Sequence, residues 1–330
     1  MAASAIRHLE QICSGHVVCG VPLSRISRWR IGGLADVIVR PRNIEELARL
    51  RVWLHSEGLA HVVIGATSNL LFADEGLRVI CLQIGGDFAS LSVAGCEITA
   101  GPGCWVPGLA RRAMQAGLTG LEHTCGIPGT LGGLICMNGG SQRKGIGDAI
   151  VSVTSVDAQG NVRHRTREEC AFAYRQSVFQ TCGDVIAGAV LRLRPTPDRA
   201  LVRREMLEIL GSRRRKFPQK QPNCGSVFVS NPAMYGEYGP PGAVIQRLGF
   251  KGRRLGGALV SAQHANFIVN AGGATAGDVL SLIKEINSAV LTATGYAMEV
   301  EARYVSAHGD ILPAGSSLTT RPIWRLHPST

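Results

Sequence analysis

The stretch HVVIGATSNLL, residues 61–71, joins a β-branched segment to a loop of small polar residues. Residues 61–64 have the composition of a strand, and Gly65 directly after them marks its end. Small residues after a strand let backbone N–H groups approach a pyrophosphate, and serine and asparagine add hydrogen bonds. An ordinary strand-to-loop turn is the alternative. The stretch matches neither the Walker loop nor G-x-G-x-x-G, so it predicts neither a P-loop nor a Rossmann fold.

A second glycine-rich stretch, GIPGTLGG at residues 126–133, continues to MNGG at residues 137–140. β-Branched and apolar residues separate its glycines, which argues against a disordered linker. Because glycine lets the backbone approach a ligand closely, the pattern favours a packed loop pressed against a flat ligand. A structural corner rich in glycine is the alternative.

Helical and strand patterns occur in both halves of the chain. Asn43 can cap a helix that runs to residue 58, with Glu46 at the capping-box position. Pro195-Thr196-Pro197 ends a strand and is the best domain boundary. The other predicted helices span residues 105–116, 198–216 and 275–292, and the other predicted strands span residues 150–156, 162–165, 185–194, 226–229, 265–270 and 296–306. Thr275 can cap the last of these helices, with Asp278 at the capping-box position and Gly295 at its stop. This mixture predicts an α+β protein.

Composition narrows the class of ligand. The 330 residues carry a net charge of +11 and one dense basic run, Arg213 to Lys216. No aromatic residues interleave that run, so phosphorylated ligands or a solvated face are favoured over nucleic acid. Ten cysteines without a C-x-x-C pair predict reduced thiols and no metal site. No signal peptide and no run of about 18 apolar residues is found, which predicts a cytoplasmic protein without a membrane span.

Two short segments carry side chains suited to catalysis. In Tyr174-Arg175-Gln176-Ser177, the arginine can hold a carboxylate or form a surface ion pair. In NCGSVF, residues 223–228, Ser226 follows a glycine at the start of a predicted strand. It can be a nucleophile, a proton donor or a serine that only bonds to backbone, and the G-x-S-x-G elbow is absent.

A third segment, MEVEAR at residues 298–303, closes the last predicted strand. The two-residue period of a strand places Glu299, Glu301 and Arg303 on one face. That face is either solvated or the place of a buried catalytic carboxylate.

The order of the motifs is more specific than any one of them. Besides the segments above, the chain carries RIGG at 30–33, GLTGLE at 117–122, GGA at 256–258 and HANFIVN at 264–270. Over residues 22–306 the series resembles the UDP-N-acetylenolpyruvoylglucosamine reductase family, flavoenzymes of peptidoglycan precursor synthesis, in its shorter form without a tyrosine-bearing insertion.

The resemblance implies a two-lobed FAD-binding domain of the vanillyl-alcohol-oxidase (PCMH) type at residues 22–197. A smaller α+β substrate domain at 198–306 follows. Residues 1–21 are then a leader and 307–330 a loose tail. The implied reaction uses NADPH to reduce FAD, whose N5 gives hydride to the enolpyruvyl group of UDP-N-acetylglucosamine enolpyruvate, yielding UDP-N-acetylmuramate. Other FAD-dependent oxidoreductases of this superfamily, or a non-catalytic nucleotide-sugar-binding protein, are the alternatives.

Carried over position by position, the resemblance assigns three sets of residues. The catalytic set has Arg175 on the substrate carboxylate, Ser226 as proton donor and Glu301 assisting, with Glu299 as the rival to Glu301. The cofactor set is Gly65, Ala66, Thr67, Ser68, Asn69, Leu70, Gly126, Ile127, Pro128, Gly129, Thr130, Gly132, Gly133, Asn138 and Gly139. The substrate set is Tyr174, Arg213, Lys216 and Asn266.

Two departures from the family pattern bear on the cofactor. Gly65-Ala66-Thr67-Ser68-Asn69 replaces the usual Gly-Gly-Gly-Ser-Asn, which puts side chains where backbone approaches the pyrophosphate. Residues 138–143 read NGGSQR and lack the usual tyrosine. Neither change removes a predicted catalytic residue, so an active enzyme is expected.

Overall fold

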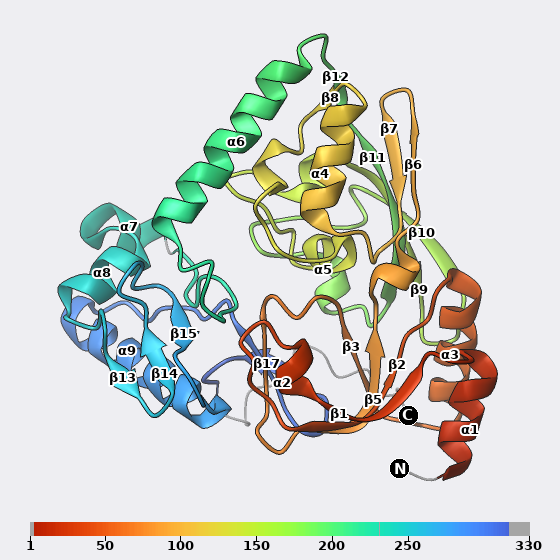
Figure 1. Ribbon diagram of the computed structural model, residues 1–330, viewed down its shortest axis with the longest axis horizontal. Coiled ribbons are helices and arrows are strands. Elements are labelled where there is room, and N and C mark those ends of the chain that lie inside the picture. Colours follow the sequence, from red (N-terminus) through yellow and green to blue (C-terminus); the bar gives the residue numbers. More distant parts are fainter. Residues whose placement is uncertain (1–2, 231, 317–330) are drawn as a thin grey trace.

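The first lobe is a four-stranded sheet with two helices packed on it. The computed structural model describes residues 3–230 and 232–316 (Figure 1). The sheet has the order β1-β2-β5-β3, formed by β1 (Val17–Pro22), β2 (Leu34–Val39), β5 (Leu77–Gln83) and β3 (His61–Ile64). Helices α1 (Ala3–Ile12) and α3 (Ile44–Ser56) contribute Leu9, Leu50 and Leu54 to a core shared with β2 and β5. The short helix α2 (Leu23–Ile26) follows β1.

The second lobe is an antiparallel sheet covered by helices. Its order is β10-β9-β11-β7-β6, formed by β10 (Val162–Thr166), β9 (Ile150–Val156), β11 (Val185–Arg192), β7 (Glu97–Ala100) and β6 (Leu91–Ala94). Helices α4 (Val106–Gln115) and α5 (Leu131–Cys136) share one apolar core with this sheet. A small pair, β8 (Leu118–Thr119) with β12 (Arg194–Pro195), and the short helices η1 (Gly86–Phe88), η2 (Glu122–Thr124), η3 (Ile146–Asp148) and η4 (Val178–Gln180) complete the lobe.

Helix α6 (Arg199–Lys216) leads from the second lobe to the last domain, as Figure 1 shows. That domain holds α7 (Pro232–Tyr238), α8 (Pro241–Arg247), α9 (Ala276–Thr294) and a sheet of β13 (Arg254–Leu255), β14 (Ala258–Val260) and β15 (Ile268–Asn270). Trp29 of the first lobe is fully buried in the core of this last domain, and its indole N–H donates to the Ile268 carbonyl, 2.8 Å away. The last domain is therefore fastened to the first lobe.

A third small sheet brings the end of the chain to the first glycine loop. Strand β16 (Arg303–Val305) pairs antiparallel with β17 (Ile311–Pro313) and parallel with β4 (Leu70–Phe72). In that register Arg303 lies opposite Leu70. The segment that carries Glu301 is thus adjacent to residues 65–70.

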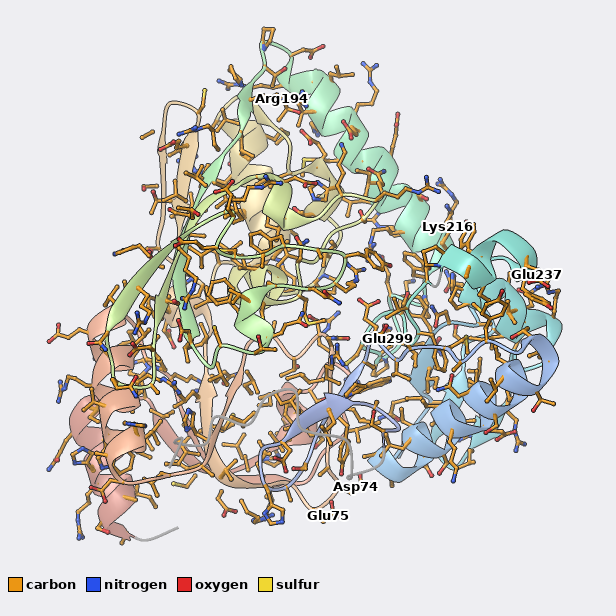
Figure 2. The ribbon with its side chains drawn as sticks, turned by 180° about the vertical axis from the view of Figure 1, so that it is seen from behind. Asp74, Glu75, Arg194, Lys216, Glu237 and Glu299 are labelled. Atoms are coloured by element: carbon orange, nitrogen blue, oxygen red, sulfur yellow. The ribbon has the colours of Figure 1, made fainter. Side chains whose placement is uncertain are left out.

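Local capping signals from the sequence are confirmed. The Asn43 side chain accepts a hydrogen bond from the Glu46 N–H at the start of α3, whereas the Glu46 carboxylate accepts from the Arg42 N–H and not from that of Asn43. Thr275 and Asp278 form a reciprocal capping box at the start of α9, and Gly295 ends this helix with φ of 74°. Asp74 of the first lobe also accepts from the Ala276 N–H of α9 at 2.8 Å (Figure 2).

Two predicted strands had the wrong extent, and the predicted leader and tail contain regular elements. The predicted leader contains α1 and most of β1, because the apolar edge of β2 pairs with Val17 to Pro22. The predicted strand at 226–229 is a single bridge between Phe228 and Val300, and the one at 296–306 is a strand only at 303–305. The predicted tail contains β17, and its residues 317–330 lie outside the described part.

One further finding concerns the predicted absence of a membrane span. Within the described residues, none of the helices combines the length and the apolar character needed to cross a membrane.

Candidate active site

A cavity of about 770 Å³ lies where the two lobes and the last domain meet. The two predicted glycine loops and the three predicted catalytic side chains all line it. The sequence-predicted residues on its wall are Gly65 to Leu70, Gly126 to Thr130, Gly132, Gly133, Gly139, Arg175, Arg213, Ser226 and Glu301. Asn138, Tyr174, Lys216 and Asn266 do not line it. One space therefore unites most of the predicted cofactor, catalytic and substrate residues.

The two glycine loops face each other across this cavity at close range. A Cβ atom on Gly65 would lie 2.5 Å from Thr130 Oγ1, and one on Gly129 would lie 3.3 Å from Ser68 Oγ. Side chains at these positions would push the loops apart. The two predicted loops therefore pack together with the Thr130 and Ser68 hydroxyls at their contact, and glycine at these positions lets the chains come close.

Thr67 shows how the chain tolerates a side chain in the first loop. Its φ is 54°, in the left-handed region that favours glycine, and it is buried. The hydroxyl turns away from the loop, donates to the Ile26 carbonyl at 2.9 Å and accepts from the Arg28 N–H at 3.2 Å. The departure from the family pattern thus anchors the loop to the segment after α2.

Ser226 sits in a loop that several neighbours hold in place. The Cys224 thiol donates to the carbonyls of Leu70 at 3.3 Å and Thr67 at 3.4 Å. Burial raises the pKa of Cys224 to about 12, so this thiol stays protonated and can donate. Gly225, with φ of 81°, then turns the chain into Ser226. The proposed proton donor is therefore tied to the first glycine loop.

Asn266 supports the same loop without reaching the cavity. Its side-chain amide accepts from the Phe228 N–H and donates to the Phe228 carbonyl, each at 2.9 Å, and its own carbonyl accepts from the Val227 N–H. Asn138 has a comparable place behind the second loop, where it donates to Ala173 and accepts from the Gly147 N–H. Both side chains bond to backbone, and their predicted contacts with the cofactor and the substrate stay predictions.

Arg175 and Glu301 form an ion pair 2.7 Å long between Nε and Oε1. Arg175 comes from the turn at 173–176, which gives it a φ of 57°. Glu301 is held by backbone, since its carbonyl accepts from Asn69 Nδ2 and its N–H donates to the Val227 carbonyl. Burial raises the pKa of Glu301, and the charges of Arg175 and Arg303 oppose that rise.

Arg303 is a site residue that the sequence reading noted only as part of a strand face. It lines the cavity with 7% of its surface exposed, and its Nε and Nη1 have no hydrogen-bond partner among the described residues. Burial lowers the pKa of Arg303. A buried guanidinium with free N–H groups fits an anionic or carbonyl group of a bound molecule. The signal in the sequence for a place in the site was the position of Arg303 two residues after Glu301, on the same face of a strand.

Arg213 is the second cation of this kind. It lines the cavity, its Nε is buried without a partner in the described part of the chain, and burial lowers the pKa of Arg213. Its Cδ would lie 2.4 Å from a Cβ on Gly126, so it packs on the second glycine loop. Lys216, by contrast, is exposed at the end of α6 (Figure 2). Tyr174 is 60% exposed, and the Arg175 guanidinium carbon lies 5.4 Å from its ring centre.

Comparison with known proteins defines the family. A family model described as FAD binding domain matches residues 35–166, and one described as UDP-N-acetylenolpyruvoylglucosamine reductase, C-terminal domain, matches residues 217–305. UDP-N-acetylenolpyruvoylglucosamine reductase 1 of Corynebacterium glutamicum is 43% identical over 294 residues, covering 89% of this chain and 88% of that protein. The reductase of Heliobacterium modesticaldum is 39% identical over 296 residues, covering 90% and 93%. A crystal structure of UDP-N-acetylenolpyruvylglucosamine reductase (MurB) from Thermus caldophilus has a TM-score of 0.73 at 30% identity, covering 87% of this chain and 97% of that one.

The fold and the cavity define a flavin-dependent oxidoreductase with a two-lobed FAD domain and a smaller α+β domain. More narrowly, the chain belongs to the UDP-N-acetylenolpyruvoylglucosamine reductase family. The predicted family, fold class, enzyme class and FAD cofactor are confirmed. The roles of single residues and the domain limits stay predictions.

Proposed function

We propose that this protein catalyses the NADPH-dependent reduction of UDP-N-acetylglucosamine enolpyruvate to UDP-N-acetylmuramate, a step of peptidoglycan precursor synthesis in the cytoplasm. The observation that carries the proposal is the meeting of Arg175, Ser226 and Glu301 in one cavity with both glycine loops. An unrelated flavin oxidase has no reason to keep these three side chains together. Membership of the reductase family supports the same reaction.

FAD fits the residues that surround the cavity. The two loops bring closely packed glycines and small side chains to the cavity wall, and Arg303 and Arg213 supply buried N–H groups that lack hydrogen-bond partners in the described residues. Bound FAD would supply the hydride that adds to the vinyl carbon of the substrate. The chain itself binds the reactants, orients them and handles the proton.

The protein's chemical task is to stabilise and then protonate a carbanion. Hydride addition to the terminal vinyl carbon leaves negative charge on the adjacent carbon and its carboxylate. Arg175 would hold that carboxylate and stabilise the charge, because a fixed cation in a partly buried site is already oriented for it. Ser226 would donate the proton, since it lies on the same wall. Glu301 assists at the carboxylate.

The basic residues match the charge of the ligands. FAD, NADPH and the UDP-sugar are all anionic, and the chain carries a net charge of +11. Arg213, on the cavity wall, and Lys216, one helical turn further along α6, would meet phosphates of the UDP-sugar. We expect no metal and no nucleic acid to take part. The FAD domain is proposed to span residues 22–197 and the substrate domain 198–306.

An anaerobic absorbance experiment tests the proposal. NADPH should bleach the bound flavin, and UDP-N-acetylglucosamine enolpyruvate should restore the oxidised spectrum with formation of UDP-N-acetylmuramate. Flavin that is bleached but not reoxidised by this substrate would point to another FAD-dependent oxidoreductase. Purified protein that binds the nucleotide sugar without retaining flavin would point to a non-catalytic binding protein.

A further inference from the structure

The ion pair between Arg175 and Glu301 joins two side chains that are both proposed to act on one substrate carboxylate. Their charged atoms are 2.7 Å apart, and the two side chains are 26% and 17% exposed. Both line the cavity. In this arrangement the Glu301 carboxylate lies against the guanidinium that the substrate carboxylate would need, as a charge contact in which Arg175 Nε makes no hydrogen bond to the described residues.

The charged groups around Glu301 determine its protonation state when the substrate carboxylate binds. Arg175 comes from the 173–176 turn, Arg303 from β16, and Glu299 from the segment that leads into β16 (Figure 2). The other ionisable side chains on the cavity wall are Arg28, Arg213, Asp184, His61, Cys136 and Cys224. Asp184 is already paired with Arg165 at 2.5 Å. Glu301 is thus the carboxylate on the wall that shares its cation with the proposed substrate site.

We infer that the substrate carboxylate displaces Glu301 from Arg175, and that Glu301 takes up a proton as it is displaced. This inference rests on the proposed function, because it needs a substrate with a carboxylate. The exchange balances in atoms and charge. Before binding, Arg175 is paired with ionised Glu301, and the substrate carboxylate is free and ionised. After binding, Arg175 is paired with the substrate carboxylate, and Glu301 is neutral because it has taken one proton from the solvent. No bond other than the new O–H of Glu301 is formed.

Two physical effects favour this exchange over a shared cation. Burial already raises the pKa of Glu301, and the attraction of Arg175 is what opposes that rise most strongly. Once the guanidinium faces the substrate carboxylate, Glu301 loses that attraction and gains a like charge nearby, and both changes favour its neutral form. A protonated Glu301 can also donate a hydrogen bond to the substrate, which an ionised one cannot do.

The sign of the pH dependence follows from this change. The pKa of Glu301 is higher in the complex than in the free enzyme, so a proton is taken up at pH values between the two. Binding is strongest at pH below the free-enzyme pKa and weakens as pH rises through this window. The limit is about tenfold in Kd per pH unit for one proton.

Calorimetry of the oxidised, FAD-loaded enzyme measures the proton directly. UDP-N-acetylglucosamine enolpyruvate is titrated in buffers that differ in ionisation enthalpy, at several pH values upward from about 5, above the usual range of a glutamate. The slope of the observed enthalpy against buffer enthalpy should reach an uptake of up to about one proton per substrate. UDP-N-acetylglucosamine, which lacks the carboxylate, should give little uptake.

Two variants assign the proton to a residue. Glu301→Gln should abolish the uptake and make substrate binding nearly independent of pH. The matched control Glu299→Gln, two residues away and exposed, should keep the uptake. Uptake that persists in Glu301→Gln would overturn the assignment and indicate another group. Should Glu301→Gln not fold, the weakening of wild-type binding with rising pH is the test that needs no variant.

Failure of this inference is distinguishable from failure of the proposed function. Wild-type enzyme that binds the substrate tightly with no proton uptake at any pH, yet is reoxidised by it, would refute the carboxylate exchange and leave the reaction intact. Equal uptake with UDP-N-acetylglucosamine would also refute it, because the proton would then follow the nucleotide sugar rather than the carboxylate.

Discussion

Replacing Thr67 by valine should destabilise the protein through the loss of two partly buried hydrogen bonds. The hydroxyl bonds to the Ile26 carbonyl at 2.9 Å and to the Arg28 N–H at 3.2 Å, and the residue is 3% exposed. Valine keeps the shape and the left-handed backbone but offers no partner to either group. At about 1 kcal/mol for each bond, the free energy of unfolding should fall by about 2 kcal/mol.

Replacing the same residue by glycine should cost less. A non-glycine residue at φ of 54° carries strain of about 1–2 kcal/mol, which glycine relieves. The greater conformational entropy of glycine in the unfolded chain lowers the free energy of unfolding by about 0.5–1 kcal/mol, which offsets part of that relief. The net loss for Thr67→Gly is therefore about 1 kcal/mol, and Thr67→Ser, which keeps the hydroxyl, should be close to wild type.

Thermal unfolding of the three variants, with flavin fluorescence to measure the Kd for FAD, checks the ranking. The melting temperature should fall in the order serine, glycine, valine, and FAD affinity should fall in the same order because the loop lines the cavity. A valine variant as stable as wild type would refute the anchoring role of the hydroxyl. A glycine variant less stable than the valine variant would refute the strain at this position.

Three further predictions concern other residues. Arg213→Ala and Lys216→Ala should raise KM for the UDP-sugar more than they lower kcat, because contacts to remote phosphates stabilise the ground state and the transition state equally. Steady-state kinetics check this, and an effect on kcat alone would contradict phosphate binding. Asp74→Ala should lower the free energy of unfolding by about 1 kcal/mol, because Asp74 caps α9 from outside; an unchanged melting temperature would contradict this. Asn266→Ala should lower the melting temperature and slow flavin reoxidation while leaving reduction by NADPH near normal; equal slowing of both half-reactions would count against a positioning role.

Local signals in the sequence were sufficient for elements that depend on nearby residues. Asn43 and Thr275 identified the starts of α3 and α9 because a cap and its helix lie within four residues. The glycine loops were found because close packing between them favours small residues, as the contact between Gly65 and the Thr130 side chain shows. Such features depend on residues that are close together in the sequence.

Features that depend on distant partners were not predictable from a pattern. The pairing of β16 with β4 joins residues more than 230 apart, and it brings Glu301 beside Asn69. The strand expected at 226–229 is absent because Asn266 takes the backbone bonds of Phe228 that a ladder would use. Strand β1 was missed because none of its residues is buried and its backbone pairing with β2 leaves no hydrophobic pattern in the sequence.

The same distinction applies to the site. Arg175, Ser226 and Glu301 were assigned by the order of motifs, while each segment alone left a structural alternative open. Asn266 and Asn138 share those motifs but bond to backbone behind the cavity. Arg303 was missed as a site residue since charged residues on alternate positions usually indicate a solvated face.

The half-reactions of Ser226→Ala test the central claim most directly. Flavin reduction by NADPH should remain near normal in this variant, whereas reoxidation by UDP-N-acetylglucosamine enolpyruvate should slow by about 10²–10⁴-fold, the usual effect of losing a positioned acid. Ser226→Cys, which keeps an acidic hydrogen, should lie between the two. Equal slowing of reduction and reoxidation in stopped-flow traces, or reoxidation at the wild-type rate, would contradict Ser226 as the proton donor.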